Sequence, residues 1–285
     1  MSRFSRRRLA LLGPAAILAS SVGRAQTWTN PTVSDEDRRI FKNYSRWAWY
    51  NSGAAPDAST RYRAKLSADG LPASEIERQM RVVESDFRQI WKLDVGWEIA
   101  YESPANARFR TTPSPWLAQA VAGVKPGRAL DLGMRQGRNG LFLAKQGWDV
   151  TGIDFSGAAI SHARMDAKKA GVHYNTIVAS IEEWDMGTEQ WDLIVACLEP
   201  DLSWSGRIVR ALRTGGLFVR EGYGPGRIRG SVDKGENEVI KAFLALRVLR
   251  YEDKIDDPHY DPVGLPVVPF RMLRLMAQKI AEAKP

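Results

Sequence analysis

Two short apolar runs, each ending near an acidic residue, constrain the fold of this chain more than any other feature. The first run, residues 129–132, contains Asp131 and leads into a turn with Gly133 and Gly137. The second run ends at Asp154, about 20 residues after that turn begins. This succession predicts a strand, a tight turn, a helix and a second parallel strand, with a nucleoside held across the two strand ends. Glycine suits such a turn because a Cβ would block close approach of the backbone.

Charge and composition argue against nucleic acid as a partner. The chain has 285 residues, 44% of them hydrophobic, and a net charge of +8. Residues 1–25 contribute +5 through five arginines, which leaves only +3 for the remainder. Basic residues interleaved with aromatic ones, as nucleic-acid surfaces require, do not form a stripe anywhere in the chain. Length and apolar content predict a globular α/β domain with an additional segment.

The first 25 residues are interpreted as a signal peptide. Arg6-Arg7-Arg8 precedes an apolar stretch, and Gly23-Arg24-Ala25 offers small residues for cleavage after Ala25. The paired arginines resemble a bacterial twin-arginine signal, which predicts an exported, periplasmic protein. An uncleaved membrane anchor is the alternative, but the apolar stretch is shorter than the ~20 residues that span a bilayer. We therefore expect no stable membrane span after removal of the signal.

Residues 26–111 are predicted to form a helical appendage. Apolar residues at helical spacing predict helices beginning near Asp35, at 61–68 and at 73–91. The tryptophans of this segment fall on apolar helix faces, so they are interpreted as packing residues rather than a ligand cage. These tryptophans are Trp47, Trp49, Trp91 and Trp97. The turn-forming residues 111–115 mark the boundary with a second domain, residues 112–285.

The second domain alternates strand and helix patterns. Strands are predicted at 129–132, 149–153, 174–178, 191–196 and 217–219. Helices are predicted at 116–121, 139–145, 158–170 and 238–246, and a further helix is predicted to end at residue 212. Two further strands, 248–253 and 267–275, are joined by a loop too short for a crossover helix and therefore form an antiparallel hairpin. The fold class is α/β: a Rossmann-like, seven-stranded, mostly parallel sheet with a terminal antiparallel hairpin and helices on both faces.

These motifs together resemble those of the class I S-adenosylmethionine-dependent methyltransferases. The resemblance covers residues 112–285 and rests on the following segments: Leu130–Gly133, Gly137-Arg138-Asn139, Thr151–Ser156, Trp191–Val195 and Leu212–Gly216. The first two are especially similar to the branch with a G-x-G-R-N motif, which includes small-molecule and tellurite-type enzymes. The resemblance implies S-adenosyl-L-methionine as cofactor and a small-molecule methyl acceptor as partner.

The resemblance assigns the methionyl end of the cofactor to the first turn. Asp131 would orient the methionyl amine, and Gly133 and Gly137 would admit the methionyl and ribose parts against bare backbone. Met134 and Asn139 complete the cofactor-binding turn.

The adenosine end is assigned to the second and third strands. Asp154 would hold the ribose hydroxyls, Phe155 would lie along the adenine, and Ser180 and Ile181 would border its edge. Cys197, after the fourth strand, would line the passage to the methyl group.

The chain departs from the family at Arg135, where glycine is usual. A cation there faces a ligand that carries a sulfonium, so the side chain points to solvent, pairs with the methionyl carboxylate, or impairs the pocket. Ser180 likewise replaces the acid that often contacts adenine.

No catalytic residue is assigned, because methyl transfer from a sulfonium mainly requires alignment. A base is needed only where the acceptor must lose a proton. The candidates Glu199, Asp201, Glu221, Tyr223 and His259 are each expected to be solvated loop residues. The sequence Glu199-Pro200-Asp201 lacks the amide-plus-prolines signature of enzymes that methylate amino groups of nucleic acids and proteins, which favours a small-molecule acceptor. Scattered histidines and one cysteine predict no metal site.

Two other functions remain open. A nicotinamide-dependent oxidoreductase needs G-x-G-x-x-G, and Arg135 occupies the place of its second glycine. A non-catalytic nucleoside-binding protein on the same fold is the stronger alternative. Export would separate the protein from a cofactor that is made in the cytoplasm. Arg135, in place of the usual glycine, also favours the non-catalytic alternative.

The signal assignment predicts that changing both Arg6 and Arg7 to lysine retains the protein in the cytoplasm of a bacterial host. The unaltered chain should appear as a shortened periplasmic form, because the paired arginines are the recognised feature. Cell fractionation followed by mass determination measures both forms. Full-length unaltered protein in the cytosol would contradict the assignment.

Overall fold

The computed structural model describes residues 34–51, 58–85, 97–102, 109–198, 202–224, 237–257 and 269–281. The chain divides into two compact units, residues 1–107 and 108–285, which are considered separately. The predicted signal peptide lies outside the described residues. Within the described ranges, no helix combines the length and apolar character that crossing a bilayer requires.

The first unit consists of helices around a small aromatic core. Its helices are α2 (Asp35–Asn51), α3 (Ala58–Ala68) and α4 (Ala73–Glu84), and residues 97–102 are also helical. Tyr44 and Trp47 pack against Tyr62 with ring centroids 5.1 and 5.2 Å apart. Trp47 is therefore a packing residue, as predicted.

Helix α4 is shorter than the sequence pattern predicts. It ends at Glu84 instead of residue 91, and Ser85 adopts an extended conformation. The Ser85 hydroxyl donates to the Val82 carbonyl at 2.8 Å, so it competes with the helical hydrogen-bond pattern. Trp91 lies outside the described residues.

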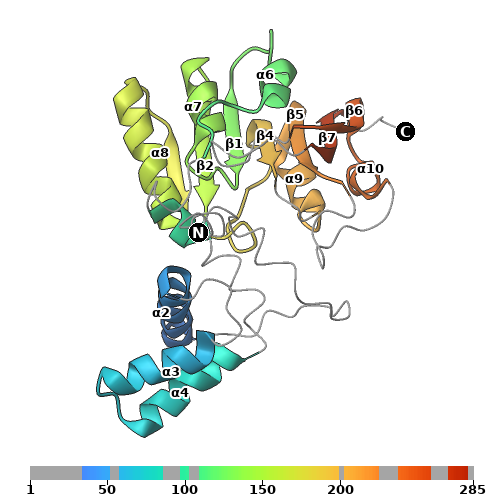
Figure 1. The fold of residues 1–285 in the computed structure, drawn as a ribbon. Helices are drawn as coiled ribbons and strands as arrows, with labels where there is room; N and C mark the ends of the chain where they lie inside the picture. Colours follow the sequence, from blue (N-terminus) through green and yellow to red (C-terminus); the bar gives the residue numbers. More distant parts are fainter. Residues whose placement is uncertain are drawn as a thin grey trace, which may run out of the picture. The chain divides into compact units, whose positions relative to one another are not determined.

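The second unit is built on a seven-stranded sheet (Figure 1). Its strands are β1 (Arg128–Leu132), β2 (Asp149–Asp154), β3 (Asn175–Val178), β4 (Trp191–Cys197), β5 (Leu212–Tyr223), β6 (Arg247–Asp256) and β7 (Phe270–Gln278). The spatial order is β3-β2-β1-β4-β5-β7-β6. The first five strands run parallel, and β7 is antiparallel to both β5 and β6. The predicted fold class is confirmed.

Helices cover both faces of this sheet (Figure 1). Helices α6 (Pro115–Ala120), α7 (Arg138–Lys145) and α8 (Gly157–Ala170) contribute to one core, and α9 (Ser205–Ala211) and α10 (Glu238–Ala242) contribute to the other. Residues 179–190, which connect β3 to β4, contain turns and bends but no helix.

Strand β5 is much longer than the predicted segment 217–219. It starts at Leu212, where a helix was predicted to end, and runs to Tyr223 between β4 and β7. Arg220 and Glu221 interrupt the apolar pattern, yet both are buried in the strand. Pairing with β7, which is distant in sequence, sets the length of β5, so local patterning underestimates it.

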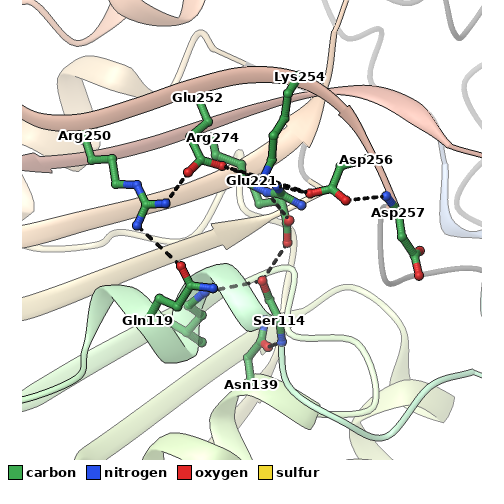
Figure 2. Close-up of polar contacts among 11 residues, drawn as sticks. Ser114, Gln119, Asn139, Glu221, Arg250, Glu252, Lys254, Asp256, Asp257 and Arg274 are labelled. Carbon is green, nitrogen blue, oxygen red and sulfur yellow. Dashed lines mark hydrogen bonds and ion pairs between the residues drawn. The ribbon is translucent and has the colours of Figure 1, made fainter.

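A buried polar network connects strands β5 and β7 to helices α6 and α7 (Figure 2). Glu221 accepts a 2.7 Å hydrogen bond from Nε of Arg274 on β7 and a 2.6 Å bond from the Ser114 hydroxyl. The backbone N–H of Ser114 donates to Oδ1 of Asn139 in α7 at 2.9 Å. Arg274 also donates to Asp256 of β6 at 2.6 Å. The network therefore connects the terminal hairpin, β5, α6 and α7.

The burial of Glu221 and Arg274 predicts that Arg274→Met is strongly destabilising. Removing one partner of a buried ion pair leaves an uncompensated charge and costs about 3–5 kcal/mol. Urea unfolding measures the loss. Arg271→Met, which breaks an ion pair of the same strand with Asp253 that is about one-third exposed, is the matched control and should cost about 1 kcal/mol or less. Equal losses in the two variants would contradict a special role for the buried pair.

Candidate functional site

The turn between β1 and α7 contains three residues with left-handed backbone conformation. Gly133 has a φ of 62°, Arg135 of 58° and Gly137 of 80°. The Met134 N–H donates to the Ile153 carbonyl at 3.0 Å, which fixes the turn against β2. Glycine adopts this conformation freely, whereas arginine there is strained.

Gly137 and Met134 serve internal packing. A Cβ on Gly137 would lie 2.2 Å from the Tyr174 hydroxyl, so glycine is needed for α8 and Tyr174 to approach the turn. The Met134 side chain is buried and fills the space that a Cβ on Gly152 would need, with its sulfur 2.1 Å from that position. Any contact of Met134 with a ligand would therefore involve its backbone.

Asp131 is buried below the first turn of α7. Burial raises the pKa of this carboxyl to about 7, against the opposing effects of Arg138 and of a hydrogen bond from the Gly140 backbone. Within the described residues, Oδ2 of Asp131 has no hydrogen-bond partner. A buried oxygen of this kind can accept a hydrogen bond from a donor supplied by a ligand.

Asp154 lies beside this turn at the carboxyl end of β2. Oδ2 accepts a 2.8 Å bond from the Arg135 N–H, and Oδ1 accepts a 2.9 Å bond from the Ser156 N–H. The carboxylate therefore stabilises the glycine turn itself.

The residues predicted to contact adenine have different environments. Phe155 is 39% exposed at the end of β2, whereas Ile181 belongs to a buried core. The Ser180 hydroxyl donates to the Glu182 carboxylate and accepts the Glu182 N–H at 3.2 Å. Arg207 of α9 donates to the Ile181 carbonyl at 2.8 Å and so holds this loop against the sheet.

The Arg135 side chain extends from the glycine turn to the end of β4. Its Nη2 donates to the Leu198 carbonyl at 3.3 Å. Leu198 has a φ of 65°, and its N–H donates to the Glu221 carbonyl at 2.6 Å. Strand order reverses between β1 and β4, and ligands of open α/β sheets bind outside the carboxyl ends of the strands at this point. Arg135 thus lies at the edge of the sheet where such ligands bind.

The residues near the end of β4 and β5 are mostly buried. Burial raises the pKa of the Cys197 thiol, so it is protonated at neutral pH and is not a nucleophile. Oδ1 of Asn139 accepts a hydrogen bond from the Ser114 N–H. The expectation that Glu221 is a solvated loop residue is wrong, because its carboxylate is fully buried and paired with Arg274.

The remaining base candidates do not form a catalytic cluster with Glu221 in the described residues. The expectation that Tyr223 is a solvated loop residue is also wrong, because it belongs to β5 and is half-buried, with its ring packed edge-on against Phe270 at a centroid distance of 5.7 Å. Glu199, Asp201 and His259 lie outside the described residues.

Sequence reasoning missed a strap formed by residues 109–114, which runs along the glycine turn. Gln136 donates to the Arg110 carbonyl at 3.1 Å, and Arg138 donates to the Thr112 carbonyl at 3.4 Å. Arg110 pairs with Asp257 at 3.2 Å. The sequence contains one signal for it, since Ser114-Pro115 combines a helix N-cap with proline at the first helical position.

Comparison with known proteins locates a family match in this unit. Residues 129–216, which include the turn, Asp131 and Asp154, match the model of a methyltransferase domain. This segment extends from β1 into β5, so the part of the chain that is similar to a methyltransferase domain includes the glycine turn and both acids.

Curated relatives match over limited lengths. A ubiquinone biosynthesis O-methyltransferase of Erwinia tasmaniensis is 29% identical over 104 residues, 36% of this chain and 42% of that protein. Hemagglutinin 1 of Eikenella corrodens is 26% identical over 188 residues, 59% of this chain and 60% of that protein. The chain thus spans about half the length of the curated relatives it matches. The crystal structure of TehB from Haemophilus influenzae has 20% identity and a TM-score of 0.48, and the alignment covers 57% of this chain and 61% of that chain.

The raised pKa of Asp131 predicts a pH-dependent penalty on stability. In the unfolded chain the carboxyl loses its proton near pH 3.9, while in the folded protein it keeps it to about pH 7. Folding is therefore favoured at low pH, and this contribution is lost as the pH rises through 7. Asp131→Asn should become more stable relative to the unaltered protein between pH 5 and pH 8, by a difference of the order of 2–4 kcal/mol.

Urea unfolding at pH 5 and pH 8 measures this difference. Asp149→Asn, which removes an exposed carboxylate from the start of β2, controls for the loss of one negative charge. Parallel stability curves for the unaltered protein and Asp131→Asn would show that the Asp131 carboxyl ionises normally.

Proposed function

We propose that the second unit transfers a methyl group from S-adenosyl-L-methionine to a small-molecule acceptor. The observation that carries this proposal is the placement of Asp131 and Asp154 on adjacent parallel strands around a left-handed glycine turn. The match of the same segment to a methyltransferase domain supports it. The name of the Erwinia relative, an O-methyltransferase, is consistent with an acceptor that is a small molecule.

The residues of the site fit this cofactor. Oδ2 of Asp131 can accept the methionyl amine, because it has no hydrogen-bond partner among the described residues. Asp154, which holds the turn, lies at the carboxyl end of β2, where the resemblance places the ribose hydroxyls. The exposed ring of Phe155 offers an apolar surface for adenine. Bound S-adenosyl-L-methionine supplies an electrophilic methyl group on a sulfonium.

The contribution of the protein to such a reaction is alignment and exclusion of water. The strap, α6 and the Glu221 network fix the glycine turn relative to β4 and β5. Holding two reactants in line converts a bimolecular step into one within a complex, which accounts for much of the rate gain in displacements of this kind. Cys197, protonated and buried, does not compete as a methyl acceptor.

A second candidate function is non-catalytic binding of the nucleoside. The contact between Arg135 and the Leu198 carbonyl favours it, because the side chain lies across the carboxyl ends of β1 and β4, where glycine is usual in the family that the sequence resembles. Periplasmic export, which we propose from the twin-arginine-like signal, also favours it, since the cofactor is made in the cytoplasm.

Calorimetric titration with S-adenosyl-L-methionine and with S-adenosylhomocysteine, its demethylated product, tests the proposed function. Asp154→Ala should weaken binding of both by about 10- to 100-fold, because charge-assisted hydrogen bonds are worth about 1.5–3 kcal/mol. Asp149→Ala, at the exposed opposite end of β2, is the matched control. Thermal unfolding checks that Asp154→Ala is folded at the titration temperature.

Each outcome of this titration has a defined meaning. If the unaltered protein binds neither compound, the proposed function is wrong. Binding that is unchanged in Asp154→Ala would remove Asp154 from the site. Binding without methyl transfer to any compound of a small-molecule acceptor panel would favour the non-catalytic alternative.

A further inference from the structure

Strand β6 forms one edge of the sheet in the second unit (Figure 1). It pairs with β7 on one side, and no other strand in the described residues of this unit pairs with it. An edge strand directs part of its backbone N–H and C=O groups away from the sheet, where a further strand can bind them. Most residues of β6 are exposed, so its side chains decide which strand fits.

The regular part of this edge consists of residues 250–256. The register between β6 and β7 shifts between Val248 and Arg250, and β6 ends at Asp256. From Arg250 to Asp256, each residue has a successive partner on β7. A bulge bends a strand and interrupts its ladder, so an added strand finds its regular partners within this segment.

Alternate residues of the segment place charges of alternating sign on one face of the sheet (Figure 2). In chain order these residues are Arg250, Glu252, Lys254 and Asp256. Lys254 contacts both acids at 3.2 Å, and Arg274 of β7 contacts them at 3.5 and 2.6 Å. Since Arg274 also pairs with Glu221, the cations and anions of this face balance. Two copies of the face therefore do not repel each other through a net charge.

The other face of the same segment carries Tyr251, Asp253 and Ile255. Asp253 pairs with Arg271 of β7 at 2.6 Å, so its charge is compensated within the sheet. Ile255 is 67% exposed, and an added strand would remove part of this apolar surface from water. Both faces therefore tolerate a second strand beside β6.

The segment is complementary to itself in one antiparallel register. When the middle of the segment lies opposite the middle of a second copy, Arg250 lies opposite the partner's Asp256. In the same register, Glu252 lies opposite the partner's Lys254. Cross-strand neighbours of opposite charge stabilise an antiparallel pair, and each contact occurs twice because the arrangement is two-fold symmetric.

Neighbouring registers bring like charges together. A shift by two residues in one direction places Arg250 opposite the partner's Lys254, and a shift in the other direction places Glu252 opposite the partner's Asp256. Like charges directly opposite each other are destabilising. The complementary register also pairs the whole segment, so charge and overlap select the same arrangement.

We propose that β6 binds β6 of a second copy of this chain, antiparallel and with Asp253 of both copies beside the two-fold axis. The two sheets then form one continuous sheet through an isologous interface. Exposed charge pairs contribute little individually, so the expected dissociation constant is on the order of 10 µM. This inference concerns assembly and does not depend on the proposed function.

Disulfide trapping tests the register. Directly opposed residues of an antiparallel pair have Cα atoms about 4.5–5.5 Å apart, a separation that a disulfide bridges. Asp253→Cys should therefore form a covalent dimer on mild oxidation, measured by mass under non-reducing conditions. Ile255→Cys, on the same face, is the matched control, because its two copies lie about 13 Å apart along the strand in this register. The only native cysteine, Cys197, is buried and does not compete. Asp253→Cys should cross-link at least about ten-fold faster than Ile255→Cys.

A charge exchange tests the cross-strand pairs. Lys254→Glu makes both members of the 252–254 pair negative, and Glu252→Lys makes both positive. Each variant alone should dimerise about 10- to 100-fold more weakly, because an attraction becomes a repulsion at two symmetric places. An equimolar mixture of the two variants should dimerise like the unaltered protein, because opposite charges then face each other again. A structural role of either residue would not produce this rescue.

Analytical ultracentrifugation of the purified protein measures each dissociation constant. Lys241→Glu reverses an exposed charge on α10 and is the matched control, which should dimerise like the unaltered protein. Thermal unfolding checks that Glu252→Lys is folded, because Glu252 contacts Arg274. The cross-linking experiment does not require that variant.

Three kinds of result would overturn the inference. Unaltered protein that stays monomeric at ~0.5 mM, well above the expected dissociation constant, would exclude the dimer. Equal cross-linking of the two cysteine variants would exclude the register. A dimer that Lys254→Glu leaves unchanged, or folded charge variants whose mixture does not dimerise, would exclude the cross-strand charge pairs. None of these results bears on methyl transfer, so the proposed function is tested separately.

Discussion

The buried pairing of Glu221 with Arg274 is the interaction on which the site of the second unit depends. The two residues face each other across β5 and β7, and both are almost inaccessible to water. A buried charge is tolerated only when it is paired and hydrogen-bonded, so each side chain requires the other. The Ser114 hydroxyl donates to Glu221, and the Ser114 N–H donates to Asn139 at the start of α7. The terminal hairpin is therefore coupled to the helix that follows the glycine turn. The carboxyl ends of the strands are thereby connected by hydrogen bonds as well as by the sheet.

Two buried carboxylates at this edge differ in their hydrogen bonds. Asp154 accepts backbone N–H groups on both oxygens, from Arg135 and Ser156. Asp131 is buried with only one such bond, and burial dominates, so its pKa rises to about 7. One acid therefore holds the turn, while the other retains an oxygen that a ligand can use. The same β–turn–α motif supplies both properties because its acids meet different backbone N–H groups.

The sequence predicts the local parts of this arrangement and misses those that depend on distant pairing. Strand order along the chain, the glycine turn and the terminal hairpin follow from apolar runs and turn residues, and the structure confirms the resulting fold class. The length of β5 and the burial of Glu221 do not follow, because a charged pair in a strand resembles a solvated loop until its partner, 53 residues away, is known. The strap is missed because its contacts with Gln136 and Arg138 use the backbone carbonyls of Arg110 and Thr112. Such contacts place no requirement on the side chains of the strap, so they leave no pattern in its sequence.

Arg135 is the position at which local preference and observed structure disagree most clearly. A left-handed conformation costs a non-glycine residue about 1–2 kcal/mol, and glycine would avoid that cost at the same place. The strain is offset by two contacts, the N–H bond to Asp154 and the guanidinium bond to Leu198. Glycine would keep the first of these and lose the second. Positions that break a local rule are expected at functional sites, and here the arginine places a guanidinium at the end of β4, where a glycine would leave only backbone.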